Sequence, residues 1–209
     1  MKKAVCIYPE DPTTDFLLPL YEHICNNMHA VGLHSDTTED DDSLDKIYKE
    51  IEDAEVVVFL GHGTSKMLYG SGCANVVFED TNCHLLNDKK LFLLACNSDQ
   101  FIRNYKLANA IGFGFLPTSL DDVRQTQTLH GVWIENLDKK DVDCFNSSLV
   151  QAFISALSDN TLKDFHLLKN RLMFYIGNEI VNCLTKRGAP NYRIVADELY
   201  YAFKDMIIS

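Results

Sequence analysis

The chain alternates short, strongly apolar runs with longer amphipathic stretches, and this alternation restricts the fold more than any other feature. The apolar runs lie at 4–8, 55–61 and 90–96 and are rich in Val, Ile, Leu and Phe. Fully buried strands of a parallel sheet have this composition. Between them, apolar residues recur with helical spacing, for example at every fourth residue from Phe16 to Met28. The sequence therefore predicts an α/β fold with a mostly parallel sheet and helices on both faces.

The remaining segments are assigned by the same criteria. Further strands are predicted at 29–35 and 112–119. Helices are predicted at about 14–28, 36–54, 98–112, 142–158 and 162–184, and residues 191–203 form a short strand, a helix or both.

With 209 residues and no internal repeat or low-complexity linker, one domain is expected. The polar stretch around 136–143 is the weakest boundary. We therefore predict a single domain over 1–209, in which 1–136 form the α/β core and 137–209 a mainly helical C-terminal part.

Charge and composition exclude several classes of protein. The formal net charge is −11 and the basic residues are scattered, which disfavours direct nucleic-acid binding. No apolar run approaches the roughly 18 residues of a membrane span, and the N-terminus lacks a secretory signal pattern. The chain has seven cysteines, an odd number, and no C-x-x-C motif. These features favour a cytoplasmic protein with mostly free thiols and no membrane association.

Two of the apolar runs lead directly into chemically reactive residues. His62 follows the run 55–61, and Cys96 ends the run 90–96. In an open α/β sheet, ligands and chemistry gather at the carboxyl ends of the strands. The 34 residues between His62 and Cys96 allow one excursion and return to a parallel neighbour, and neighbouring strands lie about 4.8 Å apart. We therefore expect the two side chains to meet over one site.

The chemistry of the pair is coherent. A thiolate is a nucleophile, and an imidazole can accept its proton and later protonate a leaving amine. Gly61 and Gly63 leave the backbone beside His62 open to a substrate. A helix that begins after Cys96 is expected to offer free N–H groups to a thiolate or a developing oxyanion.

The segments "VVVFLGHG" (56–63) and "LFLLACNS" (91–98) resemble the paired signature of caspase-like (clan CD) cysteine peptidases. In that signature an apolar strand ends in His-Gly, and a later apolar strand ends in Ala-Cys. The order that follows, a helix and then a Gly-containing strand, is similar to the CHAT-type branch, which includes separase-like peptidases. The resemblance covers roughly 56–122. The compact stretch between the histidine and the cysteine departs from the family pattern and leaves the shape of the substrate groove open.

The resemblance implies a caspase-like three-layer α/β/α sandwich and endopeptidase activity without metal or organic cofactor. It implies His62 as general base or acid and Cys96 as nucleophile. It further implies that the backbone N–H groups of Gly63 and Cys96 form the oxyanion hole. Taken singly, each side chain has a simpler interpretation, a locally bonded histidine and a buried structural cysteine.

Substrate preference is less well indicated. Asp121 and Asp122 follow the predicted strand 112–119, near the expected carboxyl edge. An acidic pocket there would select Arg or Lys before the cleaved bond. The simpler interpretation is two solvated loop aspartates.

The expected partners are a protein or peptide substrate and an activating or regulatory protein. Two alternatives to a peptidase stay open. One is a catalytically inactive scaffold of the same fold, for which Cys96 would be inert toward electrophiles. The other is a flavodoxin-like module for a nucleotide or other small ligand, although neither G-x-G-x-x-G nor G-x-x-x-x-G-K-[ST] occurs. A ligand-dependent rise in melting temperature would favour that module.

Two further features of the sequence bear on metal binding and on partner binding. The spacing of Cys73, Cys83 and His84 with His62 matches no common zinc pattern. The apolar stripe of the predicted helix 162–184 is wide enough to contact a partner as well as the core, although core packing is the plainer account.

Overall fold

A single six-stranded sheet organises the part of the chain that the computed structural model describes, residues 3–34, 41–121, 123–124 and 137–209. The strand order is β2-β1-β3-β6-β7-β8. The strands are β1 (Lys3–Tyr8), β2 (Val31–His34), β3 (Ala54–Leu60), β6 (Lys90–Leu94), β7 (Ala110–Gly112) and β8 (Ile207–Ile208). All neighbours are parallel except β7 and β8, which pair antiparallel. The predicted α/β fold with a mostly parallel sheet is confirmed.

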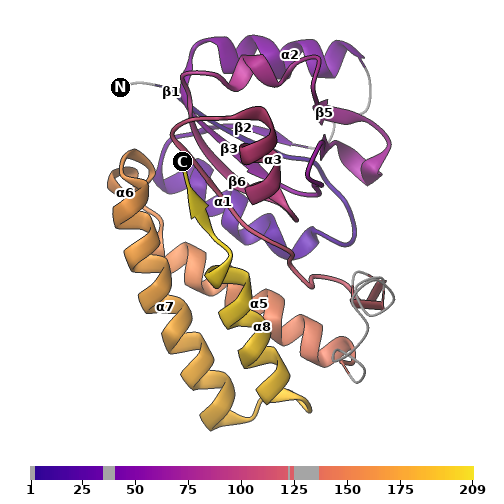
Figure 1. Ribbon diagram of the computed structural model, residues 1–209, viewed down its shortest axis with the longest axis vertical. Coiled ribbons are helices and arrows are strands. Elements are labelled where there is room, and N and C mark those ends of the chain that lie inside the picture. Colours follow the sequence, from indigo (N-terminus) through magenta and orange to yellow (C-terminus); the bar gives the residue numbers. More distant parts are fainter. Residues whose placement is uncertain (1–2, 35–40, 122, 125–136) are drawn as a thin grey trace.

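Helices cover both faces of this sheet (Figure 1). On one side lie α1 (Leu18–Asn27), α5 (Lys139–Ala156), α6 (Asp159–Lys163), α7 (Phe165–Lys186) and α8 (Tyr192–Lys204); on the other lie α2 (Asp41–Glu52) and α3 (Ser98–Tyr105). Val58 and Leu60 of β3 pack toward α1 and α5, whereas Val57 and Phe59 pack toward α2 and α3. This alternation follows from the two-residue period of a strand, and it explains why nearly every residue of β3 is apolar.

Smaller elements also lie within the described residues. They are the 3-10 helices η1 (Asp15–Leu17), η3 (Ser71–Cys73) and η4 (Cys83–Leu86), and an antiparallel pair formed by β4 (Leu68–Tyr69) and β5 (Val76–Phe78).

The prediction of a helix at 98–112 followed by a strand at 112–119 is wrong in its boundaries. The helix α3 ends at Tyr105, because Lys106 adopts a left-handed conformation (φ 53°). The strand β7 then lies at 110–112. From Phe113 on, the backbone leaves the sheet: the carbonyls of Phe113 and Gly114 accept hydrogen bonds from the N–H groups of Asp99 and Asn97.

The C-terminal part returns to the sheet. The predicted helix 162–184 is divided at Asp164, whose side chain caps α7 by accepting from the Leu167 N–H. After α8, the strand β8 adds to the edge of the sheet at β7, which the sequence analysis did not predict. The larger apolar cluster contains residues from both predicted parts, from Cys6 to Met206. Among the helices that the structure describes, none is long and apolar enough to cross a membrane.

Candidate active site

The register of β3 and β6 brings His62 and Cys96 to the same edge of the sheet. Each paired residue of β6 lies 34 positions after its β3 partner, as in Leu60 with Leu94, and Cys96 lies 34 positions after His62. The pairing extends one step past the strands, because the Gly61 N–H donates to the Leu94 carbonyl at 3.1 Å. The two chains therefore leave the sheet side by side.

His62 and Cys96 also lie on the same face. Leu60 and Leu94, two positions earlier, pack toward α1 and α5, and side chains on a strand alternate with a period of two. Both reactive side chains line one small cavity on that face. The other lining residues are Thr14, Phe16, Leu17, Gly61, Leu94, Leu116, Thr118 and Leu149. The cavity volume is about 10 Å³, room for about one water molecule.

The imidazole of His62 is held by the loop that follows β1. Its Nε2 lies 2.9 Å from the Thr13 hydroxyl and 3.2 Å from a carboxylate oxygen of Asp11. The same Asp11 oxygen accepts the Thr13 N–H at 2.8 Å, which closes a tight turn. Because β1 is the direct neighbour of β3, the residues after β1 fall beside His62.

The electrostatics of Asp11 favour its ionised form. Partial burial raises the pKa of this carboxyl, but hydrogen bonds from Thr13 and the contact with His62 outweigh it, so that the pKa is lowered. An anionic carboxylate on one ring nitrogen orients the imidazole. Asp11 and Thr13 were not predicted as site residues. The sequence feature that could have indicated these two residues is the polar segment directly after the first strand.

The thiol of Cys96 points toward the segment that follows β7. Its Sγ donates to the Leu116 carbonyl at 3.4 Å. The thiol is half-buried, under Leu116 and Thr118. The Thr118 carbonyl in turn accepts from the buried Asn146 side chain of α5 at 2.9 Å. Residues 113–118 therefore lie across the carboxyl end of β6.

The helix after Cys96 was expected to offer free N–H groups to a thiolate or an oxyanion, and the start of α3 differs from this expectation. Asn97 adopts a left-handed conformation (φ 56°), which turns the chain sharply after Cys96. The N–H groups of Asn97, Ser98 and Asp99 donate to the carbonyls of Gly114, Ala95 and Phe113. These three groups are therefore occupied by backbone and are not available to a thiolate or an oxyanion. The buried Ser98 hydroxyl fixes the turn by donating to the Leu93 carbonyl at 2.7 Å.

Gly63 lies against the backbone of Cys96. A Cβ atom on Gly63 would be 2.9 Å from the Ala95 Cβ and 3.1 Å from the Cys96 carbonyl oxygen, so the close approach requires glycine. Gly63 also faces Leu68 in an isolated bridge. The hydrogen bonds of that bridge run from Thr64 to Met67 and from Tyr69 to His62, so it does not use the Gly63 N–H. The Gly63 N–H is therefore a donor beside Cys96, which is what an oxyanion hole needs.

Of the two aspartates predicted to select a basic residue, Asp121 does not line this cavity. The Asp121 side chain is 91% exposed and pairs with Arg124 at 3.2 Å. Asp122 lies outside the described residues.

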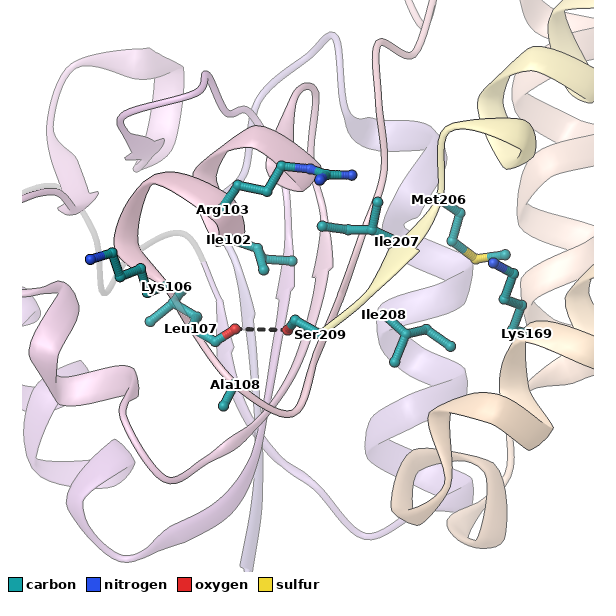
Figure 2. A pocket seen from close by; sticks show the side chains of 10 residues that line it. All are labelled: Ile102, Arg103, Lys106, Leu107, Ala108, Lys169, Met206, Ile207, Ile208 and Ser209. Carbon is teal, nitrogen blue, oxygen red and sulfur yellow. Dashed lines mark hydrogen bonds between the residues drawn. The ribbon is translucent and has the colours of Figure 1, made fainter.

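Larger hollows lie elsewhere. One of about 600 Å³ is lined by Arg103, Lys106, Lys169 and the C-terminal strand β8 (Figure 2). Its cations do not converge, since Lys106 extends away from Lys169 in Figure 2. We locate the candidate chemistry at the smaller cavity, because a cysteine and a histidine line it together. Among the residues that the structure describes, no group of three or more His, Cys, Asp or Glu side chains could hold a metal ion.

Comparison with known proteins found no relative: no family model, no curated protein and no solved structure matches the chain. The residues at the ends of β1, β3 and β6 are therefore the basis for inferring its chemistry.

Proposed function

We propose that the chain is a cysteine endopeptidase of the caspase-like kind, similar to its CHAT-type and separase-like branch. The observation that carries the proposal is the 34-residue register of β3 and β6, which sets His62 opposite Cys96 at the carboxyl edge of the sheet. The Asp11 carboxylate, 3.2 Å from His62 Nε2, supports the role of His62 as an oriented base.

In the proposed reaction His62 accepts the thiol proton of Cys96, and the sulfur attacks the carbonyl carbon of the peptide bond. The oxyanion that forms is stabilised by the N–H groups of Gly63 and Cys96. The C–N bond then breaks, and the imidazolium of His62 protonates the leaving amine. Water, deprotonated by His62, hydrolyses the thioester and restores the thiol. Asp11 stabilises the imidazolium through both stages.

The cavity is too small for a substrate in this arrangement. A peptide needs far more than the roughly 10 Å³ between His62 and Cys96. Displacement of Leu116 and its neighbours from Cys96 would open the site. This closed arrangement supports the expectation of an activating protein partner. A preference for a basic residue before the cleaved bond stays a prediction, without support from Asp121.

A second candidate function is a catalytically inactive scaffold of the same fold. The observation that favours it is the hydrogen bond from the Cys96 thiol to the Leu116 carbonyl at 3.4 Å. A thiol that donates to a carbonyl is held in its neutral form, whereas the thiolate is the nucleophile.

Peptide hydrolysis distinguishes the two functions. A diverse peptide mixture would be incubated with the protein, and new N-termini would be identified by mass spectrometry. We expect cleavage that is lost in Cys96→Ala and reduced at least about 100-fold in His62→Ala, the size of a general-base contribution. Cys83→Ala, which removes a half-buried cysteine elsewhere, should cleave normally.

Because the cavity is closed to a substrate, a second variant that loosens it is also tested. Asn146→Ala removes the bond that holds the Thr118 carbonyl and should loosen residues 113–118. Cleavage that appears or rises in Asn146→Ala, and disappears when Cys96→Ala is added, supports a restrained peptidase. Absence of Cys96-dependent cleavage in both backgrounds would favour the scaffold.

A further inference from the structure

The helix α7 has an exposed apolar face that packing within the described part of the chain does not use. Its inward face consists of the buried residues Phe165, Leu168, Leu172, Ile176 and Cys183. On the outward face, Phe174 is 63% exposed and Val181 57% exposed. Leu167, Met173 and Leu184 are also exposed there. Figure 1 shows α7 on the outer side of the helical layer, next to α5 and α8.

The outward residues follow the spacing of a coiled-coil seam. We call them the α7 seam: Leu167, Asn170, Phe174, Gly177, Val181 and Leu184, at alternating intervals of three and four. This is the a/d pattern that lets one helix pack along another. None of the six residues carries a charge, although the chain has a net charge of −11. A second copy would therefore meet no like charges along the seam.

Gly177 is the second observation that points to a partner. It lies within the 22-residue helix α7, and a Cβ atom placed on it would have nothing within 4 Å. Glycine is among the poorest residues for a helix interior, and no contact in the described monomer requires it. A close approach from outside the monomer would explain it.

The seam is complementary to itself in one orientation. When two copies of α7 run antiparallel, Leu167 faces Leu184 of the other copy, Asn170 faces Val181, and Phe174 faces Gly177. The largest side chain then fills the gap left by the smallest, twice, by the two-fold symmetry. A parallel pair would instead set Phe174 against Phe174 and Gly177 against Gly177. We propose that two copies of this chain associate through the α7 seam as an antiparallel helix pair.

The test measures self-association by sedimentation equilibrium in wild type, Gly177→Leu and Phe174→Ala. Gly177→Leu fills the gap that receives Phe174, and Phe174→Ala removes the side chain that fills it. We expect a dimer in the wild type and a dissociation constant at least about tenfold higher in each variant. Tyr200→Ala, an exposed aromatic on α8, is the matched control and should dimerise normally.

Gly177→Leu also separates loss of association from loss of folding. Leucine favours a helix and meets open space in the monomer, so the melting temperature of the dissociated chain should not fall. A wild type that stays monomeric to its solubility limit, or a dimer unaffected by both variants, would overturn the proposal.

Orientation is tested by cross-linking. In a chain with Leu167→Cys and Leu184→Cys, mild oxidation should join position 167 of one copy to position 184 of the other, as mapped by mass spectrometry. Links between 167 and 167 of the two copies would contradict the antiparallel pair.

Discussion

Asp11 links the loop after β1 to the candidate site, since its carboxylate lies 3.2 Å from His62 Nε2. Its role did not follow from residue type, because an aspartate in "PEDPTTD" is an ordinary turn residue. It follows from the strand order, which makes β1 the neighbour of β3. His62 and Cys96, by contrast, could be singled out from the sequence because each ends an apolar run.

Replacement of Asp11 by Asn should destabilise the protein by about 1.5–3 kcal/mol near neutral pH, the range for hydrogen bonds to a charged group. The folded pKa of Asp11 is lowered. Its stabilisation is therefore complete above the unfolded value of about 3.9 and is lost as the pH falls through the folded pKa. Urea unfolding of wild type and Asp11→Asn across acidic pH measures the difference.

Asp15→Asn is the control for that experiment, because Asp15 is exposed and should change stability by less than about 0.5 kcal/mol. An Asp11→Asn effect that is equally small, or one that grows below about pH 4, would contradict the hydrogen bonds assigned to Asp11.

Cys25 is predicted to be the most reactive cysteine outside the candidate site. A hydrogen bond from the buried Cys6 lowers its pKa to about 7; partial burial opposes this shift and the Tyr21 hydroxyl adds to it. Burial and the neighbouring Cys183 raise the pKa of Cys144 to about 11. Because the thiolate reacts, alkylation by iodoacetamide should rise with a midpoint near pH 7 at Cys25 and be slow at Cys144. Quantitative peptide mapping across pH measures the alkylation rate at each cysteine. Equal rates at Cys25 and Cys144 would refute the prediction.

At the scale of elements, Asp141 joins α5 to α8. It completes the capping box of α5 by accepting from the Asp138 N–H, and it also accepts from the backbone and side-chain nitrogens of Asn191, both at 2.8 Å. Asn191 precedes α8 directly. One buried carboxylate therefore fixes the start of two helices that the sequence separates by 50 positions.

Asp141→Ala should lower the free energy of unfolding by about 3 kcal/mol, because it removes a capping box and leaves three partly buried donor groups without this acceptor. Asp143→Ala, which removes only the exposed pair with Lys139, should cost about 0.5 kcal/mol or less. Urea unfolding of the two variants measures both losses of unfolding free energy. Similar losses in both would mean that Asp141 does not connect the helices.

Element boundaries show where sequence patterns stop being informative. The strands β1, β3 and β6 were predicted because their residues are buried on both faces. The shift of β7 to 110–112 could not be predicted, because it depends on hydrogen bonds between Phe113, Gly114 and the start of α3. Such pairing between distant backbone groups has no signature in residue type. The short strand β8 was missed for a similar reason, since two isoleucines after a helix do not reveal an antiparallel edge.

For the molecule as a whole, buried acids should set the pH of greatest stability. Burial, reinforced by Asp197, raises the pKa of Glu198 to about 7. A folded pKa above the unfolded value means that ionisation opposes folding, so Glu198 destabilises the fold increasingly as the pH rises from about 4.5 through 7. Glu198→Gln should therefore add on the order of 1–3 kcal/mol at about pH 8 and little at about pH 5. Urea unfolding at both pH values tests this, and a pH-independent effect would contradict it.

The overall architecture was the part most accessible from sequence, since alternating apolar runs and amphipathic stretches predict an α/β sheet. The juxtaposition of His62 and Cys96 required only that two strands be parallel neighbours. The closure of the cavity was not accessible, because it depends on Leu116 and Thr118 leaving the sheet and on Asn146 of a distant helix holding them.

The most direct measurement is covalent labelling with acyloxymethyl-ketone peptides ending in Arg, Lys, Asp or Leu, in a Cys25→Ser background that removes the competing thiol. Adducts would be located by intact mass and peptide mapping, with His62→Ala and Cys96→Ala alongside. A peptidase predicts selective labelling at Cys96 that depends on the peptide's last residue, slows in His62→Ala and is absent in Cys96→Ala. Labelling spread over several cysteines regardless of peptide, or no labelling even in the Asn146→Ala variant, would contradict a competent His62–Cys96 pair.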